Sequence, residues 1–309
     1  MMHWQILGPD GRVVREADQP CHNIVLNNAK ELVATLGLFE QSNWAVVGTG
    51  STAPAPTQTG LANEIARTNQ TVSGNPDTVT EVSTGVWEIT RYRQFTAAQV
   101  GNQNLTEWGF SGSGTPGNNL MCRELFRDGS NNPVTLTLDA DQQLRLIYKV
   151  RVTVGPTTPQ AASINITNLG VRTGQLILFR NNATSNLNPV DSLSTMARGM
   201  DGSYIAYNPS VISLNYNDPS GPFLSGGLGF FPASWQPYVS NSKKRTQNPQ
   251  TRTTNEVVGT IRGIGLSDIT GVGLYYYRVR LYFQFDSGQE IIKDNLHELT
   301  ISGFEVQWT

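Results

Sequence analysis

Hydrophobic and polar residues alternate along much of the chain, as they do in strands with one buried face. Apolar side chains occupy every second position from Leu144 to Val154, and only Ile147 breaks the alternation. A second run of this kind extends from Tyr275 to Phe285. The last run, Leu299 to Trp308, changes phase at Ser302–Gly303, which predicts a β-bulge.

Helical spacing appears only near the N-terminus. Residues 28–37 place apolar side chains on one helical face, and Gly37 is typical of a helix end. Asn28 and Glu31 have the spacing of a capping box at the start of this helix. We expect a second, shorter helix around residues 61–65.

The composition agrees with a fold made of strands. Charged residues make up 15% of the chain, whereas soluble domains average roughly 25%. The sequence instead holds 31 Thr, 26 Asn, 30 Gly and 16 Pro, which favour short strands joined by turns. Six Trp, 10 Tyr and 11 Phe supply apolar surface for a core. We therefore expect a mainly β protein of antiparallel β-sandwich architecture, with one or two short helices near the N-terminus and long loop-rich insertions.

The length of 309 residues suggests about two domains, at roughly 150 residues each. Gly155–Pro159 has the composition of a boundary. We expect an N-terminal β-domain over 1–155 and a second β-rich region over 156–309. The second region should carry a loop-rich insertion at about 180–255, which we expect a neighbouring subunit to order.

Two segments of the chain show the same order of features. Residues 122–154 and 280–308 each begin with an apolar strand and a turn containing Asp and Gly. Each then continues through a short apolar segment to a closing strand. Few identities accompany the match, so internal duplication is one interpretation and chance similarity is the other.

Net charge, hydropathy and the cysteine count indicate which partners and which cellular compartment to expect. The net charge of −2 lacks the basic excess of nucleic-acid-binding proteins, so we expect no direct nucleic-acid partner. No apolar run approaches the roughly 20 residues of a membrane-spanning helix, and we expect no membrane insertion. The first residues lack the basic and apolar regions of a signal peptide. Two cysteines make no disulfide framework, which favours folding in a reducing cytoplasm.

Candidate catalytic or metal-binding motifs are incomplete. Cys21–His22 lacks a second pair of metal ligands. Gly48–Thr52 follows an apolar strand but lacks the Walker lysine, and we interpret it as a tight turn. Ser111 lies in a sequence that falls short of a nucleophile elbow because residue 113 is not glycine. Carboxylate pairs such as Asp139 and Asp141 lie at turns. We expect no enzymatic activity and no catalytic, metal or cofactor site.

Two groups of residues are candidates for binding. One is a basic segment in an otherwise acidic chain, which we interpret as a possible protein interface: Lys243, Lys244, Arg245 and Arg252. The other is an aromatic pair suited to stacking on a sugar ring or a protein partner: Trp235 and Tyr238.

Three segments together resemble a group of structural proteins of tailed bacteriophages. They are Trp44–Leu61 with its GTGST and Pro-rich turn, Asn104–Phe110 with its LTEWGF strand, and Leu120–Phe126 with its arginine. A long closing strand completes the pattern, and the match covers about residues 23–154. The resemblance carries no catalytic motif.

The resemblance implies a virion component of the tail, baseplate, fibre attachment or neck/collar, made in the host bacterial cytoplasm. It implies partners among other virion proteins, and a symmetric homo-oligomer is the expected arrangement. Glu107 and Arg123 are expected to pair across the sheet. Three alternatives stay open: a glycan-binding receptor module, a head-decoration protein, and a polysaccharide depolymerase.

Overall fold

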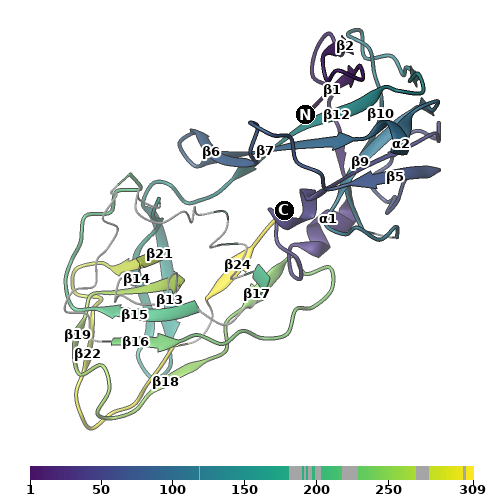
Figure 1. Ribbon diagram of the computed structural model, residues 1–309. Helices are drawn as coiled ribbons and strands as arrows, with labels where there is room; N and C mark the ends of the chain where they lie inside the picture. The colour runs from purple at the N-terminus through teal and green to yellow at the C-terminus, as the bar shows by residue number, and fades with distance from the viewer. Residues whose placement is uncertain are drawn as a thin grey trace. The chain divides into compact units, whose positions relative to one another are not determined.

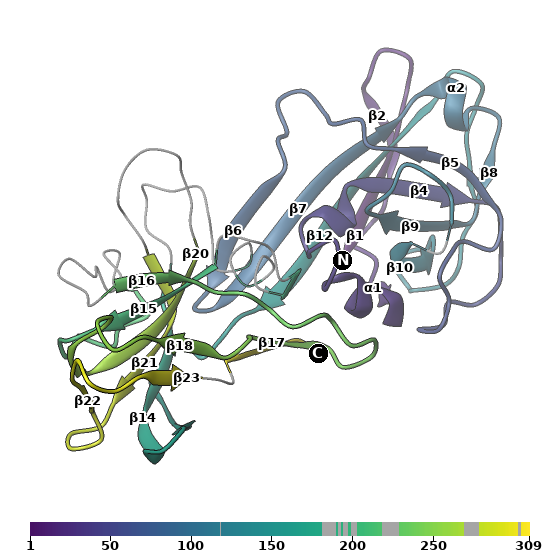
Figure 2. The same ribbon diagram turned by 90° about the horizontal axis from the view of Figure 1, so that it is seen from below.

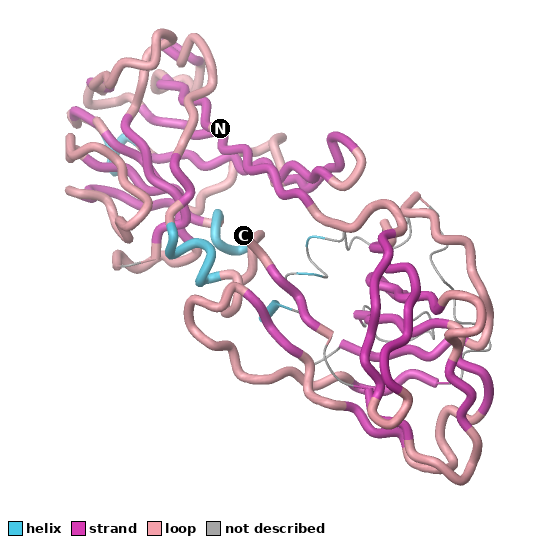
Figure 3. The backbone as a smooth tube through the Cα atoms, turned by 180° about the vertical axis from the view of Figure 1, so that it is seen from behind, coloured by secondary structure: helices cyan, strands magenta, loops and turns pink. Residues whose placement is uncertain are grey.

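The protein consists of two β-rich units, each with its own core. The computed structural model describes residues 1–117, 119–180, 190, 193, 197–198, 203–217, 229–268, 278–301 and 304–309. Unit 1 comprises Met1–Val82 and Trp87–Val152, and unit 2 comprises Ser83–Val86 and Thr153–Thr309. Strands dominate both units and helices are few and short (Figure 3). The prediction of a mainly β, antiparallel fold is confirmed.

Unit 1 is a sandwich of two five-stranded sheets (Figure 1). The first sheet has the order β2 (Val13–Glu16), β1 (Met2–Leu7), β12 (Gln143–Thr153), β7 (Val86–Phe95), β6 (Thr78–Ser83). The second has the order β3 (Ile24–Val25), β10 (Leu120–Leu125), β9 (Glu107–Ser111), β4 (Trp44–Gly48), β5 (Glu64–Thr68). A short ladder joins β8 (Asn104–Leu105) to β11 (Leu136–Thr137).

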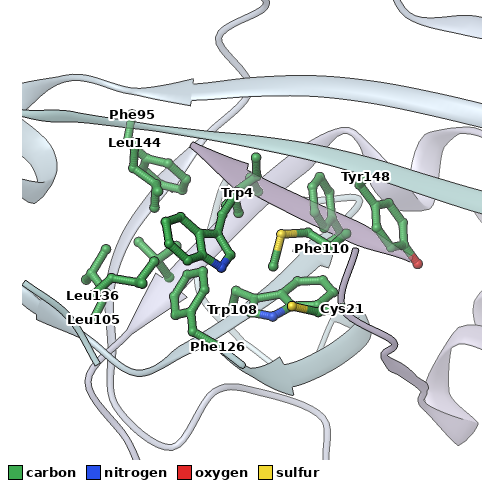
Figure 4. Packing of buried hydrophobic residues seen from close by; sticks show 14 of the residues in the cluster. Trp4, Cys21, Phe95, Leu105, Trp108, Phe110, Phe126, Leu136, Leu144 and Tyr148 are labelled. Atoms are coloured by element: carbon green, nitrogen blue, oxygen red, sulfur yellow. The ribbon is translucent and has the colours of Figure 1, made fainter. Parts of the chain in front are cut away.

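The core of unit 1 is built from the facing sides of these two sheets. Trp108 of β9 packs edge-on against Phe110 and Tyr148, with ring centroids 6.3 Å and 6.1 Å away. Phe110 stacks on Tyr148 at 4.3 Å. Trp4 and Leu144 of the first sheet complete the centre of the cluster (Figure 4). The predicted alternation of β12 is confirmed, because its apolar positions face this core.

Helices in unit 1 differ from the predicted ones. The first, α1 (Asn27–Leu32), is shorter than predicted, although turns continue to Leu36. The predicted capping box is wrong: Leu26 precedes the helix without a side-chain cap, and the Asn28 amide donates to the Leu120 carbonyl instead. The predicted helix around 61–65 is also wrong, because pairing with β4 draws residues from Glu64 onward into a strand.

Two short helical elements of unit 1 were not predicted. The 3-10 helix η1 (Glu40–Ser42) precedes β4. The helix α2 (Ala97–Val100) follows β7 and has a capping box between Thr96 and Gln99. That Thr-x-x-Gln spacing is a readable start signal, so α2 was predictable.

Unit 2 is organised around one eight-stranded sheet (Figure 2). Its order is β16 (Gly229–Pro232), β15 (Ser203–Asn208), β20 (Gly263–Asp268), β21 (Arg278–Phe285), β14 (Gly170–Leu178), β13 (Gln160–Ile166), β23 (Leu299–Ile301), β18 (Gln250–Arg252). Two small ladders accompany it: β17 (Lys244–Thr246) with β24 (Glu305–Gln307), and β19 (Gly259–Ile261) with β22 (Ile291–Lys293).

The strand predicted from Tyr275 to Phe285 is β21 in its described part, from Arg278 on. Leu281, Phe283 and Phe285 are buried as predicted. The start of that run and the phase change at Ser302–Gly303 lie outside the described residues. The described part of 180–255 contains β15, β16, β17 and β18, so short strands run through this stretch.

The two units share one strand connectivity. The β5-β4-β9-β10-β3 order of unit 1 recurs as β16-β15-β20-β21-β14, and β1-β12-β7 recurs as β13-β23-β18. The short ladder β8 with β11 recurs as β19 with β22. Backbone bonds recur as well: Thr106 donates to the Gly48 carbonyl at 2.9 Å, and Arg262 donates to the Asn208 carbonyl at 2.7 Å. Internal duplication is therefore the better interpretation of the repeated sequence features.

Two buried arginines of β7 share one carboxylate in unit 1. Arg91 and Arg93 donate to Asp77 at 2.5 Å and 2.8 Å. Arg91 also donates to the Ser42 hydroxyl, and Arg93 to the Asn43 carbonyl. Burial alone would raise the pKa of the Asp77 carboxyl, but the hydrogen bonds and charges of Arg93 and Arg91 outweigh it and lower that pKa.

We predict that Asp77→Asn lowers the free energy of unfolding by about 2 kcal/mol at neutral pH, because both arginines lose a charged acceptor. Since the folded pKa is below the unfolded value of about 3.9, the carboxylate stabilises the fold fully above about pH 4. That contribution falls as the pH drops through the folded pKa. Urea unfolding between pH 7 and pH 3 should therefore show the difference from wild type shrinking. A difference that stays constant to pH 3 would contradict this, and Asp141→Asn, at an exposed turn, is the control.

Candidate functional site

The three segments that carry the phage resemblance meet in one sheet of unit 1. Residues Trp44–Leu61 begin with β4 and continue into the loop that leads to β5. β9 pairs with β4 on one side and with β10 on the other. Segments far apart in the sequence are therefore adjacent through β9.

Glu107 and Arg123 form a buried ion pair on this sheet. The Glu107 carboxylate accepts from Arg123 Nε at 2.9 Å and from Nη2 at 2.7 Å. Glu107 is 0% exposed and Arg123 is 1% exposed. The predicted pairing is confirmed, with a diagonal geometry, because Arg123 lies opposite Gly109 in the strand register.

The same carboxylate accepts three backbone N–H groups from the loop after β4. Glu107 Oε1 accepts from Gly50 at 3.0 Å and from Asn63 at 2.8 Å. Glu107 Oε2 accepts from Ala62 at 3.0 Å. A buried carboxylate needs such partners to offset its lost hydration, and here they come from both ends of one loop.

Arg123 uses its remaining donors on the middle of that loop. Its Nη2 donates to the Thr52 carbonyl at 3.0 Å, and its Nη1 donates to Gln58 Oε1. Gln58 Oε1 also accepts from the Ala55 N–H at 2.8 Å. The loop 49–63 is thus bound to the ion pair at its start, middle and end.

The two glycines of the GTGST motif make this approach possible. A Cβ atom at Gly48 would lie 2.8 Å from Glu107 Oε1, and one at Gly50 would be closer still. The N–H of Gly50 is directed at a carboxylate of the chain itself. The predicted tight turn at Gly48–Thr52 is wrong: Gly48 ends β4, and residues 49–52 are the irregular start of the loop around the ion pair.

Other candidate nucleophiles of unit 1 are held in structural contacts. The Ser111 hydroxyl donates to Asn119 Oδ1 at 2.7 Å and accepts from Arg67 Nη1 at 3.3 Å. Burial raises the pKa of the Cys122 thiol to about 11, and burial also raises the pKa of Cys21. Thiols with such pKa values hold little thiolate at neutral pH.

In unit 2, four of the six predicted binding residues come together around β17 and β24. We call this the aromatic–basic cluster, and it comprises Tyr238, Lys243, Lys244, Arg245, Glu305 and Trp308. Tyr238 stacks on Trp308 with ring centroids 5.7 Å apart, and the Arg245 guanidinium lies 6.0 Å from the Tyr238 ring centroid. The Lys243 N–H donates to the Tyr238 hydroxyl at 3.4 Å.

Three cations and one carboxylate give this cluster a net positive charge. Lys244 Nζ lies 2.8 Å from Glu305 Oε2, and this hydrogen bond lowers the pKa of the Glu305 carboxyl. Trp308 and Glu305 were missed by sequence reasoning. Their signal was the alternation of the final strand, which places both beside the basic segment only once β24 pairs with β17.

The other two predicted residues make different contacts. The Arg252 guanidinium lies 4.1 Å from the ring centroid of Phe231, and it donates to Gln250 on its own strand at 2.6 Å. Trp235 forms a backbone bridge with Gln247 directly after β17. Arg252 is therefore a packing residue of the main sheet of unit 2.

Among the residues that the structure describes, no group of three His, Cys, Asp or Glu side chains has the arrangement of a metal site. No described helix is long and apolar enough to span a membrane. Comparisons with family models, with curated proteins and with solved structures give no match to this chain.

We predict that Glu107→Gln destabilises unit 1 by about 3 kcal/mol, because an NH₂ group would face the donors of Ala62 or Arg123. Urea unfolding followed by Trp fluorescence measures the change. Asp10→Asn, in an exposed ion pair with Arg12, is the control and should change stability by less than about 0.5 kcal/mol. Equal stabilities of the two variants would show that the buried pair does not hold the loop.

Proposed function

We propose that this chain is a non-enzymatic structural component of a tailed-phage virion, in the tail or the neck/collar. It would act as a symmetric homo-oligomer that contacts other virion proteins. The resemblance over residues 23–154 is the basis of the proposal. One observation carries it further: the three segments behind the resemblance interlock around the Glu107–Arg123 pair.

The chemistry of unit 1 supports a structural role for these segments. The buried Glu107 carboxylate accepts five hydrogen bonds from Arg123 and the loop 49–63, so both of its oxygens are occupied by contacts within the chain. The Ser111 hydroxyl is likewise engaged. Groups held in this way fix a loop in one conformation, as a rigid docking surface requires.

The alternative of a glycan-binding module rests on Tyr238 and Trp235. A sugar ring stacks on an open aromatic face, whereas Tyr238 already stacks on Trp308 and lies near Arg245. These contacts favour a protein partner for the aromatic–basic cluster. Binding to host polysaccharides on a glycan array would reverse this preference. A head-decoration protein stays a second alternative within the structural class.

The proposal predicts that the chain is present in purified phage particles at a low copy number. Few symmetry-related positions exist in a tail or neck, whereas head decoration follows the abundant capsid subunits. Quantitative mass spectrometry against the major capsid protein measures this ratio. A ratio near one would favour the head-decoration alternative, and absence from the particle would overturn the virion proposal.

A further inference from the structure

The repeated topology lets one unit serve as a reference for the other. The ladder β19 with β22 in unit 2 corresponds to β8 with β11 in unit 1. The buried pair of each ladder is apolar. Ile261 lies opposite Ile291 in unit 2, as Leu105 lies opposite Leu136 in unit 1, and all four are buried. The two ladders therefore have the same role in their cores.

Outward positions of the two ladders differ. In unit 1, Thr137 lies opposite Asn104 and donates to its side chain at 2.8 Å. In unit 2, the matching position is Ile292, which is 82% exposed. The fold accepts a polar residue at this place in unit 1, so the exposed isoleucine is not required by the architecture. A single exposed apolar side chain is ordinary, whereas a group of them is typical of a contact surface.

Further exposed apolar residues and acidic residues lie within six positions of Ile292 in the sequence or directly before its partner strand β19. We call this surface the acidic tip, and it comprises Val258, Glu290, Ile292, Asp294, Leu296 and Glu298. Leu296 is 76% exposed. The Asp294 carboxylate accepts from the Leu296 and His297 N–H groups at 2.9 Å and 3.0 Å, which fixes the turn that presents Leu296.

The nearby lysine directs its hydrogen bonds to backbone carbonyls and not to the carboxylates of this surface. Lys293 is buried, and its ammonium donates inward to the carbonyls of Thr253, Thr254 and Asp294. The acidic tip therefore combines exposed apolar side chains with an anionic rim. A complementary partner would offer apolar groups and cations.

The aromatic–basic cluster of the same unit has this complementary character. It carries Lys243, Lys244 and Arg245 against one carboxylate, and Val239 beside it is 68% exposed. Figures 1 and 2 both show β22 and β17 at opposite ends of unit 2. The two surfaces of one unit 2 therefore do not cover each other, although a second copy could cover both.

We propose that the acidic tip of one copy docks on the aromatic–basic cluster of a second copy. The inference deepens, and rests on, the proposed homo-oligomer. Because two different surfaces meet, the contact is head-to-tail, and repetition closes a ring or extends a filament. Opposite charges fix the register, and the apolar centre is removed from water.

Charge reversal tests this contact directly. A chain with Glu290→Lys and Glu298→Lys has two basic surfaces, and a chain with Lys243→Glu and Lys244→Glu has two acidic ones. Each variant alone should show a self-association dissociation constant at least tenfold larger than that of wild type in analytical ultracentrifugation. An equimolar mixture should assemble again, because each basic surface then meets an acidic one.

Ile292→Thr supplies a second variant that does not disturb folding, since the side chain is exposed and unit 1 has Thr at the matching position. It should also weaken assembly at least tenfold. Val171→Thr, at another exposed site of unit 2, is the matched control and should leave assembly unchanged. Melting temperatures report the folding of each variant.

A wild-type chain that stays monomeric to about 100 µM would overturn the inference. Variants that assemble as wild type does, or a mixture that fails to assemble, would overturn it too. These outcomes are distinct from a failure of the virion proposal, which depends on the presence of the chain in particles.

Discussion

The Glu107 carboxylate is the interaction on which unit 1 depends most. A charge at a fully buried site is costly unless every lone pair finds a donor. Arg123 and three loop N–H groups supply those donors, so the sheet and the loop 49–63 stabilise one another. This arrangement requires glycine at positions 48 and 50, because a Cβ atom at either position would be too close to Glu107 Oε1. The two ends of the loop are thereby fixed by Glu107, and its middle is fixed by Arg123.

Unit 2 has uncharged residues at the two positions that Glu107 and Arg123 occupy in unit 1. Gly263 lies opposite the end of β15, as Glu107 lies opposite the end of β4. Tyr282 takes the register position of Arg123, opposite a glycine of the neighbouring strand. Its ring packs with Phe179, Ile212 and other apolar side chains, and a Cβ at Gly263 would collide with its hydroxyl. The same strand order is therefore compatible with a buried ion pair at these positions in unit 1 and with apolar packing in unit 2.

Much of this architecture could be predicted from the sequence, because the alternation of apolar side chains in 144–154 reports a buried face directly. The pair of Glu107 and Arg123 was also predictable from its place in the motifs. The contact that Asn28 makes was not predictable from local spacing, since its amide donates to the Leu120 carbonyl on a strand distant in the sequence and does not cap the helix. Local spacing likewise failed at 61–65, where pairing with β4 decided the conformation. The aromatic–basic cluster needed Trp308, which only the pairing of β17 with β24 brings near.

Amide hydrogen exchange measured by NMR tests the role of Glu107 most directly. We expect the N–H groups of Gly50, Ala62 and Asn63 to exchange as slowly as those of β9, because they open only when the sheet opens. Exchange as fast as that of the exposed turn around Asp10 would contradict it. In that case the loop would move independently of the buried pair, and the carboxylate would not be the element that fixes it.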